Sequence, residues 1–298
     1  MINTIKNAEE KLVVALGFFD SVHKAHQRII GKTIELAQIL SATPTLFTFS
    51  NNPYIYFNKS GKLFYSYSKR ISLINNYGIK NIISYEFNQT FADLSAEDFF
   101  KLLTTRYNIA GIVAGYDYTF GKNGLGNFEL LKKLCDSKGI TCEVVDKIEI
   151  DGIKVGTTAI KEFLLNGEFD RAYAMLNRPY SIEGKVSRGR GDGKTYQHPT
   201  LNISLPDLFL PCDGVYATKT IIDGKSYKSV SNLGPQPTYE MAGKNLETHI
   251  IDSEGDFYGK EIKVEFYCFL RKIVKFYDKR ALHEQISQDI SRAKEILL

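Results

Sequence analysis

The hydrophobic pattern changes character part-way along this chain of 298 residues. In the first half, short apolar runs alternate with segments that carry apolar residues at helical spacing. From residue 180 to residue 273, short β-rich segments follow one another between Gly, Pro and Asp residues. Strand–helix alternation is typical of a doubly wound parallel sheet, and closely spaced short strands are typical of an antiparallel barrel. The chain is therefore predicted to form two domains, 1–178 and 179–298.

Apolar periodicity predicts where the individual elements lie. Strands are expected at 11–16, 45–49, 80–85, 110–114 and 142–148, and in the second half at 214–222, 227–232, 248–252 and 262–270. Helices are expected at 29–40, at 69–77, after the capping start Ser95-Ala-Glu-Asp98, at 127–137, at 158–164, at 169–176 and at 282–297. The last of these helices keeps one face apolar, so it should pack on the barrel.

The composition excludes several classes of protein. The 38 basic and 34 acidic residues leave a net charge of only +4, which does not indicate nucleic-acid binding but is compatible with anionic substrates. No apolar run reaches the ~18 residues of a membrane span, and the first ten residues lack the apolar core of a signal peptide. The four cysteines show no C-x-x-C pair. We expect a protein of the reducing cytoplasm with neither nucleic acid nor membrane as partner.

The stretch 187–202 is glycine-rich and basic, and it ends in a Pro-Thr-x-Asn element. Its glycines and cations are Gly189, Gly191, Gly193, Arg188, Arg190 and Lys194. Glycines let the backbone approach a bulky anion, and cations neutralise it. Thr200 and Asn202 offer oxygen ligands that suit a hard cation such as Mg²⁺. These residue types indicate a nucleotide-phosphate site, and a flexible hairpin loop is the alternative.

Two histidines three residues apart, His23 and His26, follow the first predicted strand. A strand-to-helix turn places such side chains at a helix N-terminus, where anions gather. There they can donate hydrogen bonds to phosphate oxygens as charge builds during transfer. A pair of surface histidines is the alternative on spacing alone.

Three more loops carry polar residues at positions where a ligand of an open α/β sheet would bind. They are 48–53 (TFSNNP), 115–121 (GYDYTFG) and 156–161 (GTTAIK). Ligands of such sheets bind beyond the carboxyl ends of the strands, so several of these loops should meet the histidine loop there.

With these ordered elements the chain resembles the prokaryotic bifunctional riboflavin kinase/FMN adenylyltransferase family, also called FAD synthetases. The family element GxFDGVHxGHQ is matched by 17–27, and TFxPHP, GxDFxFG and SSTxIR are matched by the three loops above. Its kinase module is matched at 191–202, 214–216, 232–238 and 247–259. Elements in this order over nearly the whole chain make the match specific.

The resemblance implies that a nucleotidyltransferase-like N-terminal domain joins FMN and ATP to give FAD and pyrophosphate. The FMN phosphate attacks the α-phosphorus of ATP, so positioning and charge neutralisation carry the reaction. His23 and His26 would contact the triphosphate. Further nucleotide-binding residues would be Gly17, Phe19, Asp20, Asp117, Thr157, Thr158 and Lys161, and Asn52 would lie at the flavin.

The N-terminal half departs from the family pattern at several positions. Ser21 and Ala25 replace glycines of the histidine loop, and Asn52 replaces the histidine of PHP. The remaining departures are Thr119, Gly156, Ala159 and Lys161, which stand where the family has arginine or serine. Lysine keeps the charge of arginine but loses its bidentate fork, so these changes bear on phosphate binding.

The C-terminal module would phosphorylate riboflavin at its 5′-hydroxyl. By resemblance, Glu247 is the base that accepts the hydroxyl proton, and Thr200 and Asn202 hold Mg²⁺ and the ATP phosphates. The other predicted ligand contacts are Gly191, Gly193 and Lys194 for phosphate and Arg271 for flavin. Taken alone, Glu247 would be a solvated strand glutamate and Arg271 an ordinary surface arginine. Gln197-His198 replaces the family's Gly-Phe in the phosphate loop.

Three functions follow from this pattern. The leading hypothesis is an enzyme that makes FMN from riboflavin and then FAD, with ATP and Mg²⁺. A riboflavin kinase with a degenerate adenylyltransferase domain is the second. A flavin- or nucleotide-binding sensor is the third, and the presence of Glu247 argues against it, because a binding protein has no use for a base.

Overall fold

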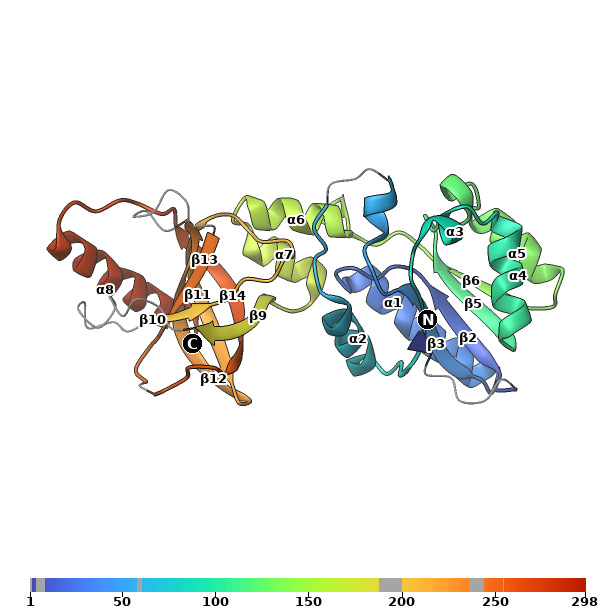
Figure 1. Cartoon of the computed structure of the whole chain (residues 1–298), viewed down its shortest axis with the longest axis horizontal. Coiled ribbons are helices and arrows are strands. Elements are labelled where there is room, and N and C mark those ends of the chain that lie inside the picture. The colour runs from blue at the N-terminus through green and yellow to red at the C-terminus, as the bar shows by residue number, and fades with distance from the viewer. Residues whose placement is uncertain (1, 4–8, 58–60, 188–199, 236–243, 254) are drawn as a thin grey trace. The chain divides into compact units, whose positions relative to one another are not determined.

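The computed structural model describes residues 2–3, 9–57, 61–187, 200–235, 244–253 and 255–298. The chain divides into two compact units, Met1–Thr157 and Thr158–Leu298, each shown in Figure 1. Helices α6 (Thr157–Leu165) and α7 (Phe169–Leu176) therefore fold largely with the second unit, where the Phe169 ring packs on Tyr216 and Phe266. The predicted boundary between the sequence domains 1–178 and 179–298 stays a prediction.

The first unit is built on a six-stranded sheet in the order β1-β4-β3-β2-β5-β6. Its strands are β1 (Ile2–Asn3), β2 (Leu12–Leu16), β3 (Thr43–Phe49), β4 (Asn81–Tyr85), β5 (Ile109–Gly115) and β6 (Thr141–Val145). All neighbours pair in parallel except β1, which runs antiparallel to β4. The predicted doubly wound parallel sheet is confirmed.

Helices cover both faces of this sheet because its strands are apolar on both sides. The longer helices are α1 (Lys24–Ile39), α2 (Tyr67–Asn76), α4 (Ala96–Arg106) and α5 (Phe128–Asp136). Side chains of α1 and α2 pack against one face, and side chains of α4 and α5 pack against the other. The short elements are η1 (Pro53–Phe57), α3 (Gln89–Ala92), η2 (Lys122–Gly124), β7 (Glu149–Ile150) and β8 (Ile153–Lys154).

The strand order reverses direction at the centre of the sheet. From β2 the chain moves outward through β3 and β4, and then returns to the other side of β2 with β5 and β6. The loops after β2 and β5 therefore leave the same edge at the switch point, where α/β sheets bind their ligands. These loops carry the predicted His23–His26 pair and Asp117.

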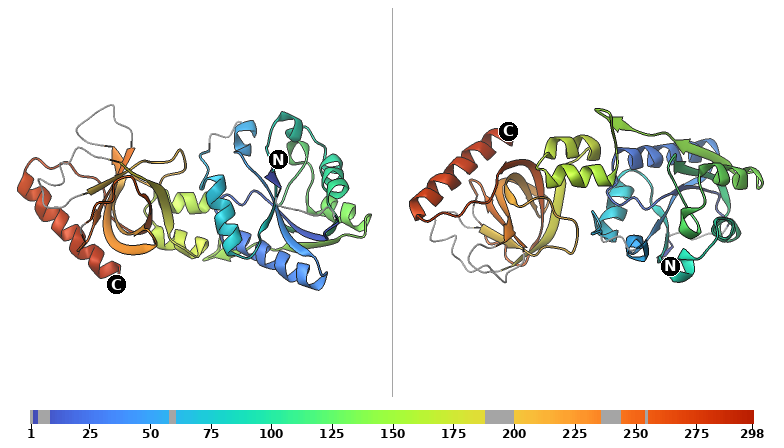
Figure 2. Two further views of the ribbon diagram at one scale, coloured as in Figure 1. Left: turned by 60° about the horizontal axis from the view of Figure 1, so that its bottom comes forward. Right: turned by 90° about the horizontal axis from the view of Figure 1, so that it is seen from above.

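The second unit is a closed antiparallel barrel in the order β10-β13-β12-β11-β14-β9, followed by a helix. Its elements are β9 (Tyr180–Ser187), β10 (Thr200–Ile203), β11 (Gly214–Ile222), β12 (Lys225–Pro235), β13 (Lys244–Ile250), β14 (Glu261–Arg271) and α8 (Lys279–Ile296). The predicted antiparallel barrel with a terminal helix is confirmed. Figure 2 shows the barrel and the helix from two further directions.

The barrel interior contains a cluster of hydroxyl groups as well as apolar side chains. The fully buried hydroxyl residues are Thr218, Thr220, Ser229, Ser231 and Thr248. They hydrogen-bond one another at 2.8 Å, so these groups have partners without water. The apolar layer on the outer face joins Val215, Ala217 and Leu270 of the strands to Ala293 and Leu297 from the end of the chain.

Candidate functional sites

His23 and His26 lie at the N-terminus of α1, directly after β2, as their spacing predicts. His23 is the N-cap, and its Nδ1 accepts a hydrogen bond from the backbone N–H of His26 at 3.2 Å. The two imidazole rings stack with 3.6 Å between their centroids, and the Phe19 ring packs on His26 at 5.0 Å. Both histidines are thus held in one orientation at a helix end that favours anions.

Left-handed backbone in this loop falls on Phe19 (φ 57°) and Val22 (φ 47°), and not on Ser21 or Ala25. For a β-branched residue such as Val22 this conformation is strained, and such strain persists only where the surroundings hold it. The Gln27 side chain supplies one such contact by donating to the Val22 carbonyl at 2.9 Å. Neither serine nor alanine therefore costs backbone strain at the two positions where the family has glycine.

The hydroxyl of Ser21 has a partner across the loop. Its Oγ lies 2.9 Å from Oγ1 of Thr157, the first residue of α6, and the Ser21 side chain is fully buried. The predicted Thr157-Thr158 pair thus begins helix α6. Thr157 is hydrogen-bonded to the histidine loop through Ser21. A glycine at position 21 could not make this bond.

Asp20 and Arg70 are both buried beneath the loop, and sequence reasoning missed Arg70. Asp20 accepts the backbone N–H of Phe64 with both carboxylate oxygens, at 2.9 and 3.1 Å. Arg70 is fully buried and donates to the carbonyls of Phe18 at 2.6 Å and Phe49 at 2.9 Å. Desolvation lowers the pKa of the Arg70 guanidinium, and the charge of Asp20 acts in the opposite direction.

The contacts of Arg70 fix the ends of two parallel strands. Its Nη1 also donates to Thr48 Oγ1 at 3.2 Å, and the guanidinium lies 4.3 Å from the centre of the Phe18 ring. One planar group therefore holds the loop after β2 against the end of β3. Its signal in the sequence is weak, because its partners lie 21 to 52 residues away.

Asp117 lies after β5 and forms an ion pair with Lys154 of β8, with 2.5 Å between Oδ2 and Nζ. This hydrogen bond raises the pKa of Lys154. Both side chains are about half exposed, and such pairs contribute at most about 1 kcal/mol. The ion pair can therefore separate at small cost, which leaves the Asp117 carboxylate available to another hydrogen-bond donor. Thr119, which stands where the family has arginine, is exposed on the same loop.

Asn52 makes local contacts at the end of β3. Its Nδ2 donates to the carbonyl of Gly61 at 3.1 Å, and its Oδ1 accepts the N–H of Tyr54 at 3.0 Å. The amide therefore shapes the turn from β3 into η1, and a flavin contact for Asn52 stays a prediction. Lys161 belongs to the second unit, where its ammonium lies 5.4 Å from the centre of the Phe209 ring.

The predicted kinase residues come together in one row on the outer face of the barrel. Asn202 of β10 is the direct register partner of Glu247 of β13, and Glu247 is the partner of Asn232 of β12. Directly opposed residues have side chains on the same face of a sheet. Leu246 and Thr248, which flank Glu247 on β13, are fully buried inside the barrel. The side chains of the row therefore point outward.

A residue that the sequence did not single out connects this row. Asn245 Nδ2 donates to Asn202 Oδ1 at 2.8 Å and to Glu247 Oε1 at 3.1 Å. Thr200 lies two residues before Asn202 on the same strand face, opposite His249. The signal for Asn245 was its i, i+2 spacing from Glu247, which places both on one face once the strand is known.

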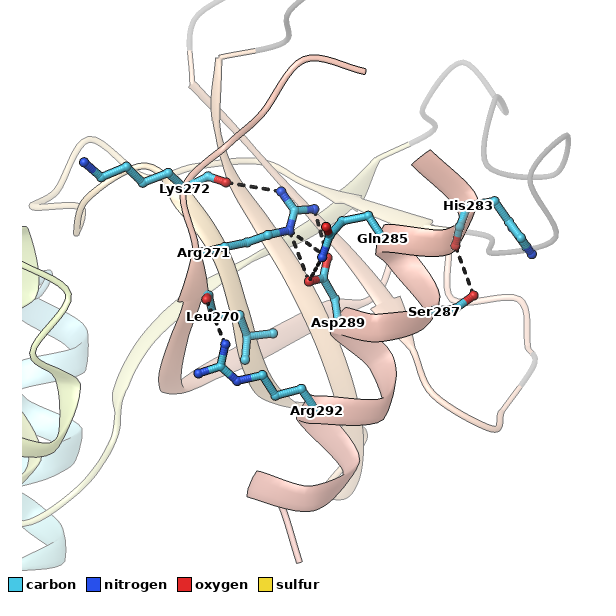
Figure 3. A network of polar contacts seen from close by, with 8 residues as sticks. All are labelled: Leu270, Arg271, Lys272, His283, Gln285, Ser287, Asp289 and Arg292. Carbon is cyan, nitrogen blue, oxygen red and sulfur yellow. Dashed lines mark hydrogen bonds and ion pairs between the residues drawn. The ribbon is translucent and has the colours of Figure 1, made fainter. Parts of the chain in front are cut away.

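Arg271 has a different neighbourhood from the one predicted for a flavin contact. As Figure 3 shows, its guanidinium forms a two-pronged ion pair with Asp289 of α8, with Nη2–Oδ2 at 2.8 Å and Nε–Oδ1 at 3.1 Å. Gln285 donates to the same carboxylate at 3.1 Å, and the Asp289 side chain is only 7% exposed. This network fastens α8 to the end of β14. A flavin role for Arg271 stays a prediction.

Some predicted residues lie outside the described part of the chain. They are Gly191, Gly193, Lys194 and the Gln197-His198 pair. The predicted metal ligands Thr200 and Asn202 are described, and they supply a hydroxyl and a carboxamide oxygen on one strand face. Neutral oxygen donors of this kind fit Mg²⁺, which takes few protein ligands and completes its shell with water and phosphates. Within the described residues, no group of three or more His, Cys, Asp or Glu could hold a metal ion.

Comparisons with known proteins identify a family for each half of the chain. A family model described as FAD synthetase matches residues 5–159, and one described as riboflavin kinase matches residues 176–297. The bifunctional riboflavin kinase/FMN adenylyltransferase of Bacillus subtilis is 33% identical over 97% of this chain and 93% of its own. The relative of that name from Buchnera aphidicola subsp. Acyrthosiphon pisum is 32% identical over 97% of this chain and 94% of its own.

A solved structure shares the fold over nearly the whole length. It is a Streptococcus pneumoniae protein titled as a macrolide-efflux protein, with a TM-score of 0.89 and 27% identity over 97% of this chain and 95% of its own. Among the described residues of the present chain, no helix combines the length and the apolar character that crossing a membrane requires.

A parallel α/β unit with a histidine loop at its switch point, joined to a barrel with a Thr-Asn-Glu row, defines a two-domain nucleotide-dependent transferase. More specifically, the chain belongs to the family of bifunctional riboflavin kinase/FMN adenylyltransferases. It is an enzyme of FAD biosynthesis that phosphorylates riboflavin to FMN with ATP and adenylylates FMN to FAD with release of pyrophosphate. Its substrates are riboflavin, FMN and ATP.

Proposed function

We propose that Glu247 is the general base of the kinase reaction and that Thr200 and Asn202 hold Mg²⁺ and the ATP phosphates. The observation that carries this proposal is the register pairing of Asn202 with Glu247. The Glu247 carboxylate, which can accept a proton, is thereby adjacent to the Asn202 carboxamide, which can bind a metal ion. Phosphoryl transfer to a hydroxyl requires both functions close together.

The reaction at this row can be written in full. The riboflavin 5′-hydroxyl oxygen bonds to the γ-phosphorus of ATP, the bond from that phosphorus to the β–γ bridging oxygen breaks, and ADP leaves. The hydroxyl proton passes to the Glu247 carboxylate. Bound Mg²⁺ would neutralise charge on the phosphate oxygens. The protein would hold the riboflavin 5′-hydroxyl and the Glu247 carboxylate within hydrogen-bond distance of each other.

We propose that the departures from the family pattern at Ser21 and Ala25 are compatible with the adenylyltransferase activity of the first half. An FMN phosphate oxygen would bond to the α-phosphorus of ATP, and the bond to the α–β bridging oxygen would break to release pyrophosphate. Two observations support activity. Ser21 and Ala25 lie at positions without left-handed backbone. Ser21 also makes a bond to Thr157 that a glycine would lack.

We assign the nucleotide in this half to the loops at the switch point. His23 and His26 would donate to the triphosphate oxygens, and preorganised donors at such a site stabilise the charge that develops during transfer. The remaining proposed contacts are Gly17, Phe19, Asp20, Asp117, Thr157, Thr158 and Lys161 for ATP, and Asn52 for flavin. In the second half, Gly191, Gly193 and Lys194 would contact phosphate, and Arg271 flavin.

Chromatography of the reaction products tests these assignments. Purified protein is incubated with riboflavin, ATP and Mg²⁺, and in a second reaction with FMN, ATP and Mg²⁺. We expect FMN and FAD from the first reaction, and FAD and pyrophosphate from the second. FMN that never proceeds to FAD in either reaction would contradict an active adenylyltransferase half. Flavin binding without any turnover would contradict both assignments.

Two further proposals concern the whole chain. We place the boundary between the two sequence domains at 178/179, close to the start of the riboflavin kinase match at 176. We also propose that the protein acts in the cytoplasm. The four cysteines are free thiols in the structure, and a reducing compartment keeps thiols in this state.

A further inference from the structure

We propose that Asn245 is a positioning residue of the riboflavin kinase reaction. Its side-chain amide holds the Glu247 carboxylate and the Asn202 carboxamide in one fixed relation. This inference rests on the proposed roles of Glu247 as base and Asn202 as metal ligand. It adds a third residue, which lies outside the family elements that match this chain.

The geometry is set by strand alternation. Asn245 and Glu247 are two residues apart on β13, so their side chains leave the strand on the same face. Asn202 faces Glu247 from the neighbouring strand, which puts all three polar side chains within one patch. The two bonds from Asn245 Nδ2, at 2.8 Å to Asn202 Oδ1 and at 3.1 Å to Glu247 Oε1, are both of ordinary hydrogen-bond length.

The chemistry of asparagine suits this task. A carboxamide nitrogen carries two N–H groups, so it can donate to two acceptors at once. A carboxylate has a second oxygen and a carboxamide oxygen has a second lone pair, so neither bond uses up the capacity of Glu247 or Asn202. Asparagine is also uncharged. A lysine at this position would neutralise the base and repel Mg²⁺.

Closure of the barrel does not depend on these bonds. The backbone of β13 pairs with β10 and β12 along its length, and Asn245 itself pairs with Gly234 of β12. The half-buried Asn245 side chain therefore does not stabilise the barrel core. Its two hydrogen bonds fix the positions of the proposed catalytic side chains, Glu247 and Asn202.

The test is steady-state kinetics of Asn245→Ala and Asn245→Thr in the full-length enzyme. Threonine retains one hydrogen-bond donor and favours β-strands. The Asn245→Thr variant therefore keeps the test valid if Asn245→Ala fails to fold. We expect Asn245→Ala to lower kcat for riboflavin phosphorylation about 10- to 100-fold, the size expected for a lost charge-assisted hydrogen bond. The Mg²⁺ concentration for half-maximal rate should rise, the KM for riboflavin should change less than about threefold, and Asn245→Thr should be intermediate.

A double-mutant cycle separates positioning from a general loss of structure. In an Asn202→Ala background, removal of Asn245 should cost clearly less than in the wild type, because residues that share a network are not additive. FMN adenylylation by the same samples reports on the integrity of the rest of the chain, and Ser226→Ala, on an exposed part of β12, is the matched barrel control.

The outcomes distinguish this inference from the function on which it rests. A kcat for Asn245→Ala within about threefold of wild type, or an equal loss in both backgrounds, would overturn the role of Asn245 while Glu247→Gln still abolished the kinase reaction. A Glu247→Gln variant with near-normal kinase rate would instead overturn the proposed base, and the positioning role would fall with it.

Discussion

Asn202 and Glu247 face each other across two antiparallel strands, and the amide of Asn245 bonds to both. The residues to which we assign riboflavin phosphorylation therefore lie on adjacent strands of a closed barrel. Rigid strands hold such groups more accurately than loops do. We therefore expect single substitutions in this row to affect riboflavin phosphorylation and to spare FMN adenylylation.

Glu247→Gln should abolish riboflavin phosphorylation and spare FMN adenylylation. Glutamine keeps the shape of glutamate but cannot accept the hydroxyl proton, so we expect kcat to fall at least about 100-fold. Separate assays with riboflavin and with FMN measure the two activities. The matched control is Glu261→Gln, an exposed glutamate on β14, which should leave both rates unchanged. Equal losses in both variants would refute the assignment.

Arg70→Lys should destabilise the first unit and impair FAD formation. An ammonium cannot replace the planar contacts to Phe18, Thr48 and Phe49. We expect a loss of about 2–4 kcal/mol in the free energy of unfolding, seen as a fall of more than about 5 °C in the melting temperature of that unit. Thermal unfolding and FMN adenylylation are the measurements. The control Lys69→Arg changes the preceding half-exposed residue and should have little effect.

Asp289→Ala should loosen α8 from the barrel. The substitution leaves the Arg271 guanidinium without its carboxylate in a partly buried setting, which costs about 2–4 kcal/mol. Urea unfolding of the full chain should show a lower midpoint for the second unit. In Arg271→Met/Asp289→Ala, part of the loss should return, because no charge is left unpaired. A double variant as unstable as the sum of both single variants would argue against the pairing.

Cys142 should be the most reactive of the cysteines with resolved shifts. A hydrogen bond from Cys135 lowers the pKa of the Cys142 thiol, whereas burial raises that of Cys268. At a given pH more of Cys142 is thiolate, the form that alkylates. Iodoacetamide labelling at pH 7.5, followed by peptide mass spectrometry, should modify Cys142 before Cys268. In Cys135→Ser, a change in the labelling rate of Cys142 would confirm that the contact sets its reactivity.

Strong periodicity made most of the fold predictable. The run at 110–114 appears as β5, and the helical spacing of 29–40 appears in α1, which begins earlier, at Lys24, because His23 caps it. The strand predicted at 142–148 ends at Val145. Beyond it, the carbonyl of Ile148 accepts the N–H of Val155 at 2.8 Å, next to the antiparallel pair of β7 and β8. The two-residue strands β7 and β8 and the single turn α3 are too short to leave a periodic signal.

The site was predictable only where a motif carried it. Thr200, Asn202 and Glu247 belong to recognisable elements, and the barrel brings them to one face. Asn245 belongs to no such motif. Its spacing from Glu247 becomes a signal only once the strand is known, and its bond to Asn202 depends on which strands pair. Arg70 was hidden for the same reason, since its acceptors belong to loops far away in the sequence. Long-range register is a property of the folded sheet and leaves no trace in local spacing.

The apolar layer outside the barrel has a consequence for synthesis of the protein. Ala293 and Leu297 complete that layer against Val215 and Ala217, and the barrel interior beneath is partly hydroxyl-lined. A ribosome must therefore have made the chain as far as Leu297 before the second unit can bury its surface. The first unit ends at Thr157 and can fold while the rest is still being translated. Nascent chains arrested near residue 250 should thus contain a folded adenylyltransferase unit and an unfinished kinase.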